Sequence, residues 1–176
     1  ALDTNRLFAD SQVAVSGCVG LALHGALGVD TVVCQGARPF GGPMAITGCQ
    51  RNQLIELDGR PAAEVLVELF HSLSPRDQLL AQRRLHLGIA ITELKTRYET
   101  GDFLVRNILQ IDHDTGHLAI GDHLRPGQTV QFHLRDPGDA SREVSELLKQ
   151  YTPFSPPAGC LLFTCTGRTS EFFGED

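Results

Sequence analysis

The sequence predicts an α+β fold in which helices pack against a largely antiparallel sheet. Short runs rich in β-branched residues are separated by Gly and Pro, which is typical of strands joined by turns. These runs form two groups, and each group is followed by a segment whose apolar residues recur at helical spacing. Hairpin turns dominate the second group, which favours antiparallel pairing. With 41% hydrophobic residues, the 176-residue chain can bury a core.

The first group of strands lies in the first third of the chain. The expected strands are residues 13–15, 19–23, 31–34, 44–47 and 53–57. Asp58 and Gly59 have the composition of a turn, so we expect the chain to leave the sheet there.

Two helices are expected next. Pro61 suits a first helical position, where its missing N–H needs no partner. One apolar stripe at helical spacing consists of Leu66, Leu69, Phe70 and Leu73. Ser74 then resembles an N-cap and Pro75 a first helical residue, so a second helix is expected through about Arg84.

The second group of strands is expected at residues 87–91, 103–111, 117–120 and 129–134. Residues 112–116 and 125–128 have hairpin-turn composition. Within residues 129–134, Val130, Phe132 and Leu134 alternate with polar residues, which predicts a half-buried strand.

The C-terminal part is expected to contain one helix and one strand. The helix begins at Asp136–Pro137 and carries one apolar face, formed by Val144, Leu147, Leu148 and Tyr151. Prolines from Pro153 onward end it. Residues 159–165 are continuously apolar and predict a final buried strand.

Charge and hydropathy exclude nucleic acid and membrane as partners. The formal net charge is −6, and Lys occurs only at Lys95 and Lys149, so no basic surface for a phosphate backbone is expected. No apolar run is long enough to span a bilayer, and without a basic leader and apolar run we expect no secretion. The five cysteines are odd in number and contain no C-x-x-C pair, which favours reduced thiols in the cytoplasm over a disulfide framework or a zinc site.

Two segments could form a binding site. In the Gly-rich residues 36–43, backbone N–H groups and Arg38 could hold a carboxylate or phosphate, although a tight inter-strand turn explains the glycines equally simply. Arg106 and Asn107 face opposite sides of the strand at residues 103–111. Arg106 must therefore be paired, exposed or directed at a ligand, and a cross-strand ion pair is the alternative.

Two further groups could carry chemistry. His113, His117 and His123 lie among aspartates, but nothing in their spacing resembles a known metal motif, so we expect a solvated hairpin and no metal. Cys165 ends the expected final strand near Arg168, which could activate its thiol, whereas a buried and inert thiol is the alternative. No catalytic signature is present, and we expect neither catalytic residues nor a cofactor.

Several segments together resemble the FIST family (F-box and intracellular signal transduction), chiefly its C-terminal sensory domain. They are residues 36–41, 53–62, 103–109, 121–122, 127–136 and 162–168, in the family's order. The resemblance divides the chain into residues 1–12, the tail of an upstream FIST N-terminal-like region, and residues 13–176, a FIST C-like sensory domain. The start at Ala1 without Met is consistent with a processed or truncated chain.

The resemblance implies a non-catalytic sensory domain that binds a small ligand such as an amino acid or another small carboxylate. Carried over motif by motif, it places ligand-binding positions at Gly36, Arg38, Arg106, Asn107, Gln131, Cys165, Gly167 and Arg168. We therefore expect Arg38, Arg106 and Arg168 to converge on one anionic group. The alternatives are a protein-interaction module, with signalling or ubiquitin-ligase proteins as partners, and a thiol enzyme built on Cys165. The sequence does not predict an oligomeric state.

Overall fold

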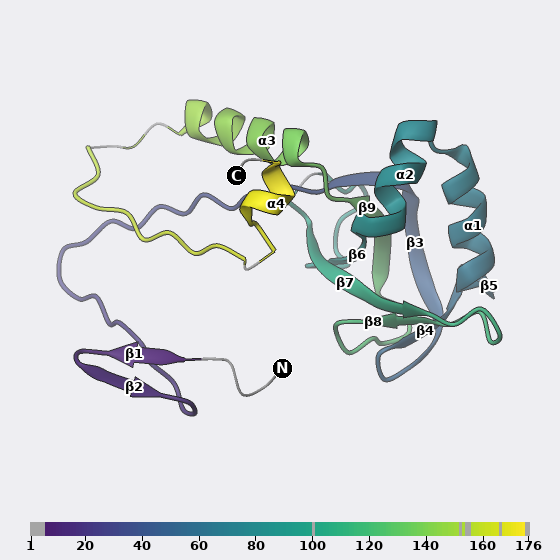
Figure 1. Ribbon diagram of the computed structural model, residues 1–176, viewed down its shortest axis with the longest axis horizontal. Helices are drawn as coiled ribbons and strands as arrows, with labels where there is room; N and C mark the ends of the chain where they lie inside the picture. Colours follow the sequence, from purple (N-terminus) through teal and green to yellow (C-terminus); the bar gives the residue numbers. More distant parts are fainter. Residues whose placement is uncertain (1–5, 100, 152, 154–155, 166, 175–176) are drawn as a thin grey trace. The chain divides into compact units, whose positions relative to one another are not determined.

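The computed structural model describes residues 6–99, 101–151, 153, 156–165 and 167–174. It divides into two compact units, Ala1–Thr31 and Val32–Asp176, which are considered separately (Figure 1). The described part of the first unit contains β1 (Leu7–Ala9) and β2 (Gln12–Ala14), paired as an antiparallel hairpin. Asp10 has a positive φ of 51° in the hairpin turn, a conformation that Asp tolerates better than most residues.

The second unit is built on a seven-stranded sheet in the order β3-β9-β6-β7-β8-β4-β5, and all its pairings are antiparallel. Because β3 also pairs with β4, the sheet closes on itself as a barrel. The strands are β3 (Arg38–Gln50), β4 (Gln53–Leu57), β5 (Arg60–Pro61), β6 (Leu85–Ala90), β7 (Phe103–Ile111), β8 (Leu118–Ile120) and β9 (Thr129–Leu134). The predicted α+β class with a largely antiparallel sheet is confirmed.

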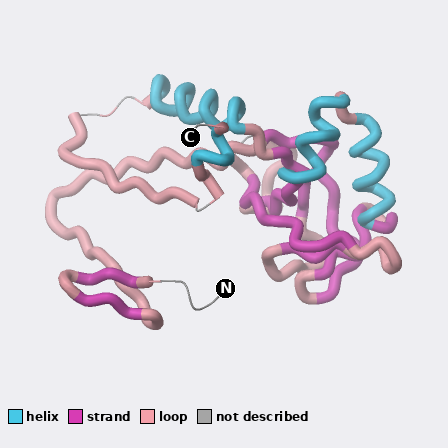
Figure 2. The backbone as a smooth tube through the Cα atoms, viewed as in Figure 1, coloured by secondary structure: helices cyan, strands magenta, loops and turns pink. Residues whose placement is uncertain are grey.

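Four helices occur in the described part of the second unit: α1 (Ala62–Ser72), α2 (Pro75–Arg84), α3 (Pro137–Gln150) and α4 (Ser170–Phe173). Figure 2 shows α1 and α2 in cyan beside the magenta sheet. The predicted caps are confirmed at two helices, because Ser74 accepts a hydrogen bond from Asp77 N and Asp136 accepts from Gly138 N and Asp139 N. At α1, Pro61 occupies the N-cap and not the first helical position that the sequence predicts.

The main hydrophobic core fills the barrel and extends under α1 and α2. From β9, Val130, Phe132 and Leu134 are fully buried, and they pack with apolar residues of the neighbouring strands and of both helices. Gln131 and His133 on the opposite face of β9 are also buried, so this strand is not half-buried as predicted. On this outer face the Phe103 ring packs against His133, and the Gln131 side chain bonds to the carbonyl oxygen of Gly41 in the neighbouring strand β3.

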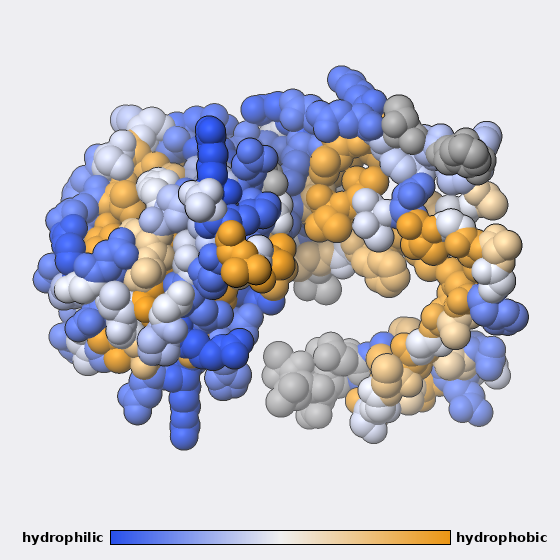
Figure 3. All heavy atoms as spheres, turned by 180° about the vertical axis from the view of Figure 1, so that it is seen from behind, coloured by the Kyte–Doolittle hydropathy of each residue, from blue (hydrophilic) through white to orange (hydrophobic). Residues whose placement is uncertain are grey.

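Three predicted strands are wrong. Residues 19–23, 31–34 and 159–165 contain no strand, and most of their apolar side chains are exposed. In the last segment, Leu162 is 85% and Phe163 89% exposed, and Figure 3 shows orange apolar side chains along the extended segments (Figure 3). High β propensity alone does not form a strand, because the backbone also needs a neighbouring strand to pair with. Of the described helices, none is long and apolar enough to cross a membrane.

Candidate functional site

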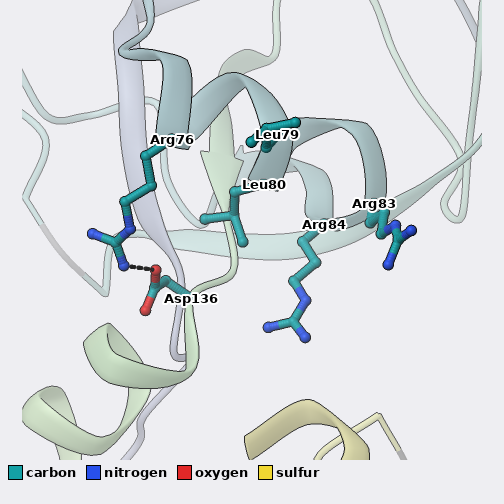
Figure 4. Close-up of a pocket in the computed structure, with 6 residues that line it drawn as sticks. All are labelled: Arg76, Leu79, Leu80, Arg83, Arg84 and Asp136. Carbon is teal, nitrogen blue, oxygen red and sulfur yellow. Dashed lines mark hydrogen bonds and ion pairs between the residues drawn. The ribbon is translucent and has the colours of Figure 1, made fainter. Parts of the chain in front are cut away.

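A cavity of about 370 Å³ lies beside α2, at the point where β9 passes into α3. It is lined by Arg76, Leu79, Leu80, Arg83, Arg84 and Asp136. Five of these residues come from α2, where spacings of three, four and seven place side chains on one face. Figure 4 shows Leu80 between the Arg76–Asp136 pair on one side and Arg84 on the other (Figure 4). The cavity is thus an open pocket on the surface, where Leu79 is 67% exposed, and it combines apolar with charged side chains.

The charges of the cavity are unequally paired. The buried Asp136 carboxylate caps α3 through Oδ1, which lies 2.7 Å from Gly138 N, and its Oδ2 lies 2.8 Å from Arg76 Nη2. Among the described residues, Arg83 and Arg84 form no salt bridge with any carboxylate. Within the part of the chain that the structure describes, the cavity thus presents two guanidinium groups whose charge no ion pair offsets.

Phe172 of α4 holds two arginines in place next to this cavity. The guanidinium carbon of Arg84 lies 4.7 Å from the centre of the Phe172 ring, and that of Arg135 lies 5.4 Å from it. Such cation–π contacts contribute roughly 0.5–2 kcal/mol each. Arg135 Nε is buried and has no hydrogen-bond partner among the described residues. The ring therefore orients cationic groups that retain unused hydrogen-bond donors.

The predicted site residues Gly36, Arg38 and Arg168 all lie close to the first turns of α3. Arg38 forms an ion pair with Asp77, and its Nε lies 2.8 Å from Asp139 Oδ2. Asp139 Oδ2 nevertheless lacks a hydrogen bond of acceptable angle, so this second contact is mainly electrostatic.

Gly36 and Arg168 have structural contacts that account for their residue types. Gly36 has φ +62°, and a Cβ there would lie 2.7 Å from the Cβ of Ala140, so only glycine allows this close approach. Its N–H donates to Glu143 Oε2 at 2.7 Å. Arg168 Nη2 donates to the carbonyl oxygen of Cys34 at 2.9 Å.

The other predicted positions lie on different parts of the barrel. Arg106 Nε donates to Asp122 Oδ2 at 2.6 Å, and Gln131 Nε2 donates to the carbonyl oxygen of Gly41 at 2.7 Å. Asn107 is exposed on β7, and its carbonyl oxygen accepts from Gly121 N. Arg38, Arg106 and Arg168 thus contact three different sets of partners, and the described contacts do not direct them at one common group.

Cys165 and Gly167 lie outside any strand. Cys165 is exposed and not buried, because the strand predicted to bury it does not form. Its sulfur accepts a hydrogen bond from Gly167 N at 3.4 Å. In the β7–β8 hairpin, Asp112 has a local structural role, since its Oδ1 accepts from Asp114 N and Thr115 N.

Sequence reasoning missed most of the residues around the cavity: Arg76, Arg83, Arg84, Arg135 and Phe172. The available signal was the spacing of Arg76, Arg83 and Arg84, which places them on one face of the helix that was predicted. Asp136 was predicted only as a helix cap. Its second role, as the anionic wall of the cavity, depends on how α2 and α3 pack.

His133, which is buried, and His86, which is half-buried, form a cross-strand pair that the sequence also did not indicate. They lie opposite each other on β6 and β9. Burial lowers the pKa of both imidazoles, and the charge of Arg135 further lowers the pKa of His86. His133 Nδ1 lies 3.0 Å from the carbonyl oxygen of Gln131 and His86 Nδ1 lies 3.0 Å from that of Arg84, so both rings are fixed.

Acidification is therefore expected to destabilise the fold through this pair. Because folding lowers both pKa values, the unfolded chain binds more protons just below the ordinary histidine pKa of about 6.5. The free energy of unfolding should fall as the pH drops from 7 to 5, as measured by urea denaturation. His133→Gln should show a smaller fall than the native chain, whereas the exposed His24→Gln should match it. An equal pH dependence in His133→Gln would contradict the assignment.

Two family models and several relatives match this chain. The FIST C domain model matches residues 62–176 and the FIST N domain model matches residues 2–60. These ranges meet near residue 61, so the division at residue 12 stays a prediction. No solved structure matches.

The relatives are described as uncharacterized proteins of mycobacteria. MT0656 of Mycobacterium tuberculosis (strain CDC 1551 / Oshkosh) is 40% identical over 171 residues, covering 96% of this chain and 44% of the relative. Mb0898c of Mycobacterium bovis (strain ATCC BAA-935 / AF2122/97) is 39% identical over 171 residues, which again cover 96% of this chain and 44% of the relative. The chain therefore spans less than half the length of these relatives.

Proposed function

Because the chain belongs to the FIST family of signal-transduction sensory domains, we propose that it binds a small carboxylate, with a free amino acid as the first candidate, in the cavity beside α2. The observation that carries this proposal is the set of side chains that line the cavity. Arg83 and Arg84 have no described ion-pair partner, Asp136 supplies one carboxylate, and two leucines supply apolar surface. We further propose that this binding involves no catalysis and takes place in the cytoplasm, where five unpaired thiols persist.

Each part of an amino acid has a suitable partner in this cavity. A guanidinium recognises a carboxylate through two parallel hydrogen bonds, which Arg84 or Arg83 can donate. The Asp136 carboxylate, held by the helix cap and by Arg76, suits the ligand ammonium group. Leu79 and Leu80 suit an aliphatic side chain.

Ligand binding can change the contacts between helices. Arg84 belongs to α2, donates to the carbonyl oxygen of Phe172 in α4 at 3.5 Å, and stacks on its ring. A ligand that engages Arg84 would therefore compete with, or reinforce, the contact that holds α4 against α2. A ligand that prefers one of these arrangements shifts the population toward it, which is the physical basis of sensing.

A thermal-shift screen of amino acids and small acids, followed by titration calorimetry, tests this proposal. A ligand that binds only the folded state raises the melting temperature. Arg83→Ala and Arg84→Lys should each weaken binding by about tenfold or more, because charge-assisted pairs contribute roughly 1.5–3 kcal/mol. Arg97→Ala, in an exposed segment remote from the cavity in sequence, is the matched control.

The choice of ligands separates the roles of the two charges. An amino acid should bind more tightly than the same acid without its amino group, because only the former can use Asp136. The proposal fails if no candidate raises the melting temperature, or if Arg83→Ala and Arg84→Lys bind as tightly as Arg97→Ala.

A protein-interaction module is the second candidate, and one observation favours it. Leu161, Leu162 and Phe163 are exposed in succession, and large exposed apolar patches often mark interaction sites. The expected partners are signalling proteins or ubiquitin-ligase components. Leu162→Ser and Phe163→Ser should then abolish partner binding in a pull-down with such a protein while leaving amino-acid binding unchanged, and unchanged partner binding would remove this candidate.

A further inference from the structure

Two of the five cysteines contact one arginine, Arg168, one through its side chain and one through its backbone. Arg168 Nη2 lies 3.5 Å from the sulfur of Cys34 and also donates to the Cys34 carbonyl oxygen. The backbone N–H of Arg168 donates to the carbonyl oxygen of Cys165 at 3.0 Å, so Cys165 and Arg168 belong to one tight turn. Cys34 thus contacts the end of the Arg168 side chain, and Cys165 contacts the backbone of the same residue.

The first thiol, Cys34, is protected and protonated. Cys34 is half-buried, and its sulfur donates to Glu143 Oε2 at 3.1 Å. Burial raises the pKa of the Cys34 thiol, and the neighbouring Glu143 adds to the rise while Arg168 opposes it. A neutral thiol next to a carboxylate can give up its proton when it attacks another sulfur.

The second thiol, Cys165, is accessible, and its surroundings lower its pKa. Cys165 is exposed, and the hydrogen bond from Gly167 N, together with the charges of Arg135 and Arg168, lowers the pKa of its thiol. The ideal Cβ position at Gly167 lies 3.5 Å from Arg135 Nη1 and 3.7 Å from the Cys165 sulfur, which places all three groups together. Exposed thiolates near cations are the cysteines that oxidants attack first.

We propose that Cys165 and Cys34 form an oxidation-sensitive pair, in which a hydroperoxide oxidises Cys165 and Cys34 then closes a disulfide next to Arg168. This proposal is independent of the ligand cavity. It requires Cys165 to approach Cys34, and the segment that carries Cys165 has no strand pairing to hold it back. A disulfide needs the two Cα atoms within roughly 7 Å of each other.

The chemistry balances in two steps. The Cys165 thiolate attacks hydrogen peroxide, the O–O bond breaks, and Cys165 sulfenic acid and hydroxide form. The Cys34 sulfur then attacks the Cys165 sulfur, the S–O bond breaks, and water leaves with the proton from Cys34. The hydroxide takes up the proton that Cys165 released when its thiolate formed. Counted from the two thiols, the protein therefore loses two electrons and two protons, and the peroxide is reduced to two molecules of water.

Oxidation would change contacts at α3. A disulfide has no S–H group, so the hydrogen bond that Cys34 donates to Glu143 is lost. The contact between the Cys34 sulfur and Arg168 also changes. Glu143 Oε2 also accepts a hydrogen bond from Gly36 N. Oxidation would therefore affect both α3 and the residues just before β3.

Mass spectrometry of the peroxide-treated chain tests the proposal. After hydrogen peroxide and iodoacetamide, a peptide that links Cys34 to Cys165 within one molecule is expected. In Cys34→Ser, dimedone should trap a sulfenic acid at Cys165. Cys160→Ser is the matched control, because Cys160 is exposed on the same segment without these arginine contacts, and it should still form the linked peptide.

Alkylation rates keep the proposal testable if a variant fails to fold. In the untreated native chain at pH 7, iodoacetamide should modify Cys165 roughly three- to tenfold faster than Cys160, because thiolates and not thiols react. Equal rates at the two cysteines would overturn the proposal. So would disulfides that join Cys165 mainly to Cys18, Cys160 or a second molecule.

Discussion

Replacing Phe132 by Ala is expected to lower the free energy of unfolding by about 3–5 kcal/mol, as for other large aromatic residues in cores. The Phe132 side chain is fully buried at the centre of β9, and its ring centre lies 5.9 Å from that of Phe40 on β3. Phe132 pairs with Leu87 of β6 on one side and with Phe40 of β3 on the other, so it adjoins both strands that flank β9. No side chain nearby can fill the space left behind without disturbing the barrel, and the cavity adds to the lost burial.

Phe163→Ala is the matched control for this substitution. Phe163 is 89% exposed, and an exposed side chain contributes little, so the change should stay within about 0.5 kcal/mol. Urea denaturation of the two variants measures the difference directly. Similar losses in both variants would show that residues 159–165 are packed in solution, and this would restore the strand that the sequence predicts there.

Elements with strong local signals could be predicted from the sequence. The second helix was placed at residues 75–84 because Ser74 and Pro75 define its start, and α2 has those bounds. The strands β4, β7 and β9 also have their predicted bounds, since turns that contain Gly, Asp or Pro frame them. Local capping and turn chemistry, which can be read from neighbouring residues alone, determine these boundaries.

The closure of the barrel could not be predicted, because it depends on pairing between distant strands. The strand β3 begins at Arg38 and runs through the Gly-rich segment that the sequence assigned to a turn or a binding loop. A bulge between Phe40 and Met44 makes this possible, and Gly41 takes a positive φ of 65° within it. The glycines therefore allow β3 to bend. A bent strand of this kind and a turn are both rich in glycine, so the sequence alone does not distinguish them.

The sequence predicted the type of side chain at the candidate site, which is arginine, but not which arginines form it. A site based on arginines was expected, yet Arg38 and Arg106 form ion pairs with aspartates distant in sequence. Their partners, Asp77 and Asp122, lie 39 and 16 residues away, and no local rule reveals such pairs. Arg83 and Arg84, which line the cavity and have no described ion pair, lie on α2, where the sequence predicted only a helix.

Gly88→Ala is expected to destabilise the chain by about 1–3 kcal/mol, the usual cost of overpacking a closely packed interior. A Cβ at Gly88 would lie 2.5 Å from His133 Cε1 and 2.9 Å from the Cβ of Phe103. Neither neighbour can move easily, because the His133 ring is buried and hydrogen bonded and the Phe103 Cβ is attached directly to the backbone of β7. Gly42→Ala is the matched control in β3, where no atom lies within 4 Å of the ideal Cβ, and it should be close to neutral.

A double-mutant cycle identifies His133 as the cause of this cost. In a His133→Ala background the nearest clash is gone, so Gly88→Ala should cost at least about 1 kcal/mol less than in the native chain, as coupled neighbours do. Chemical denaturation of the four proteins gives the coupling energy. Additive effects would mean that Phe103 alone resists the added methyl group. A clear coupling would show that glycine is required at residue 88 because a buried histidine occupies the space of a side chain on the outer face of the sheet.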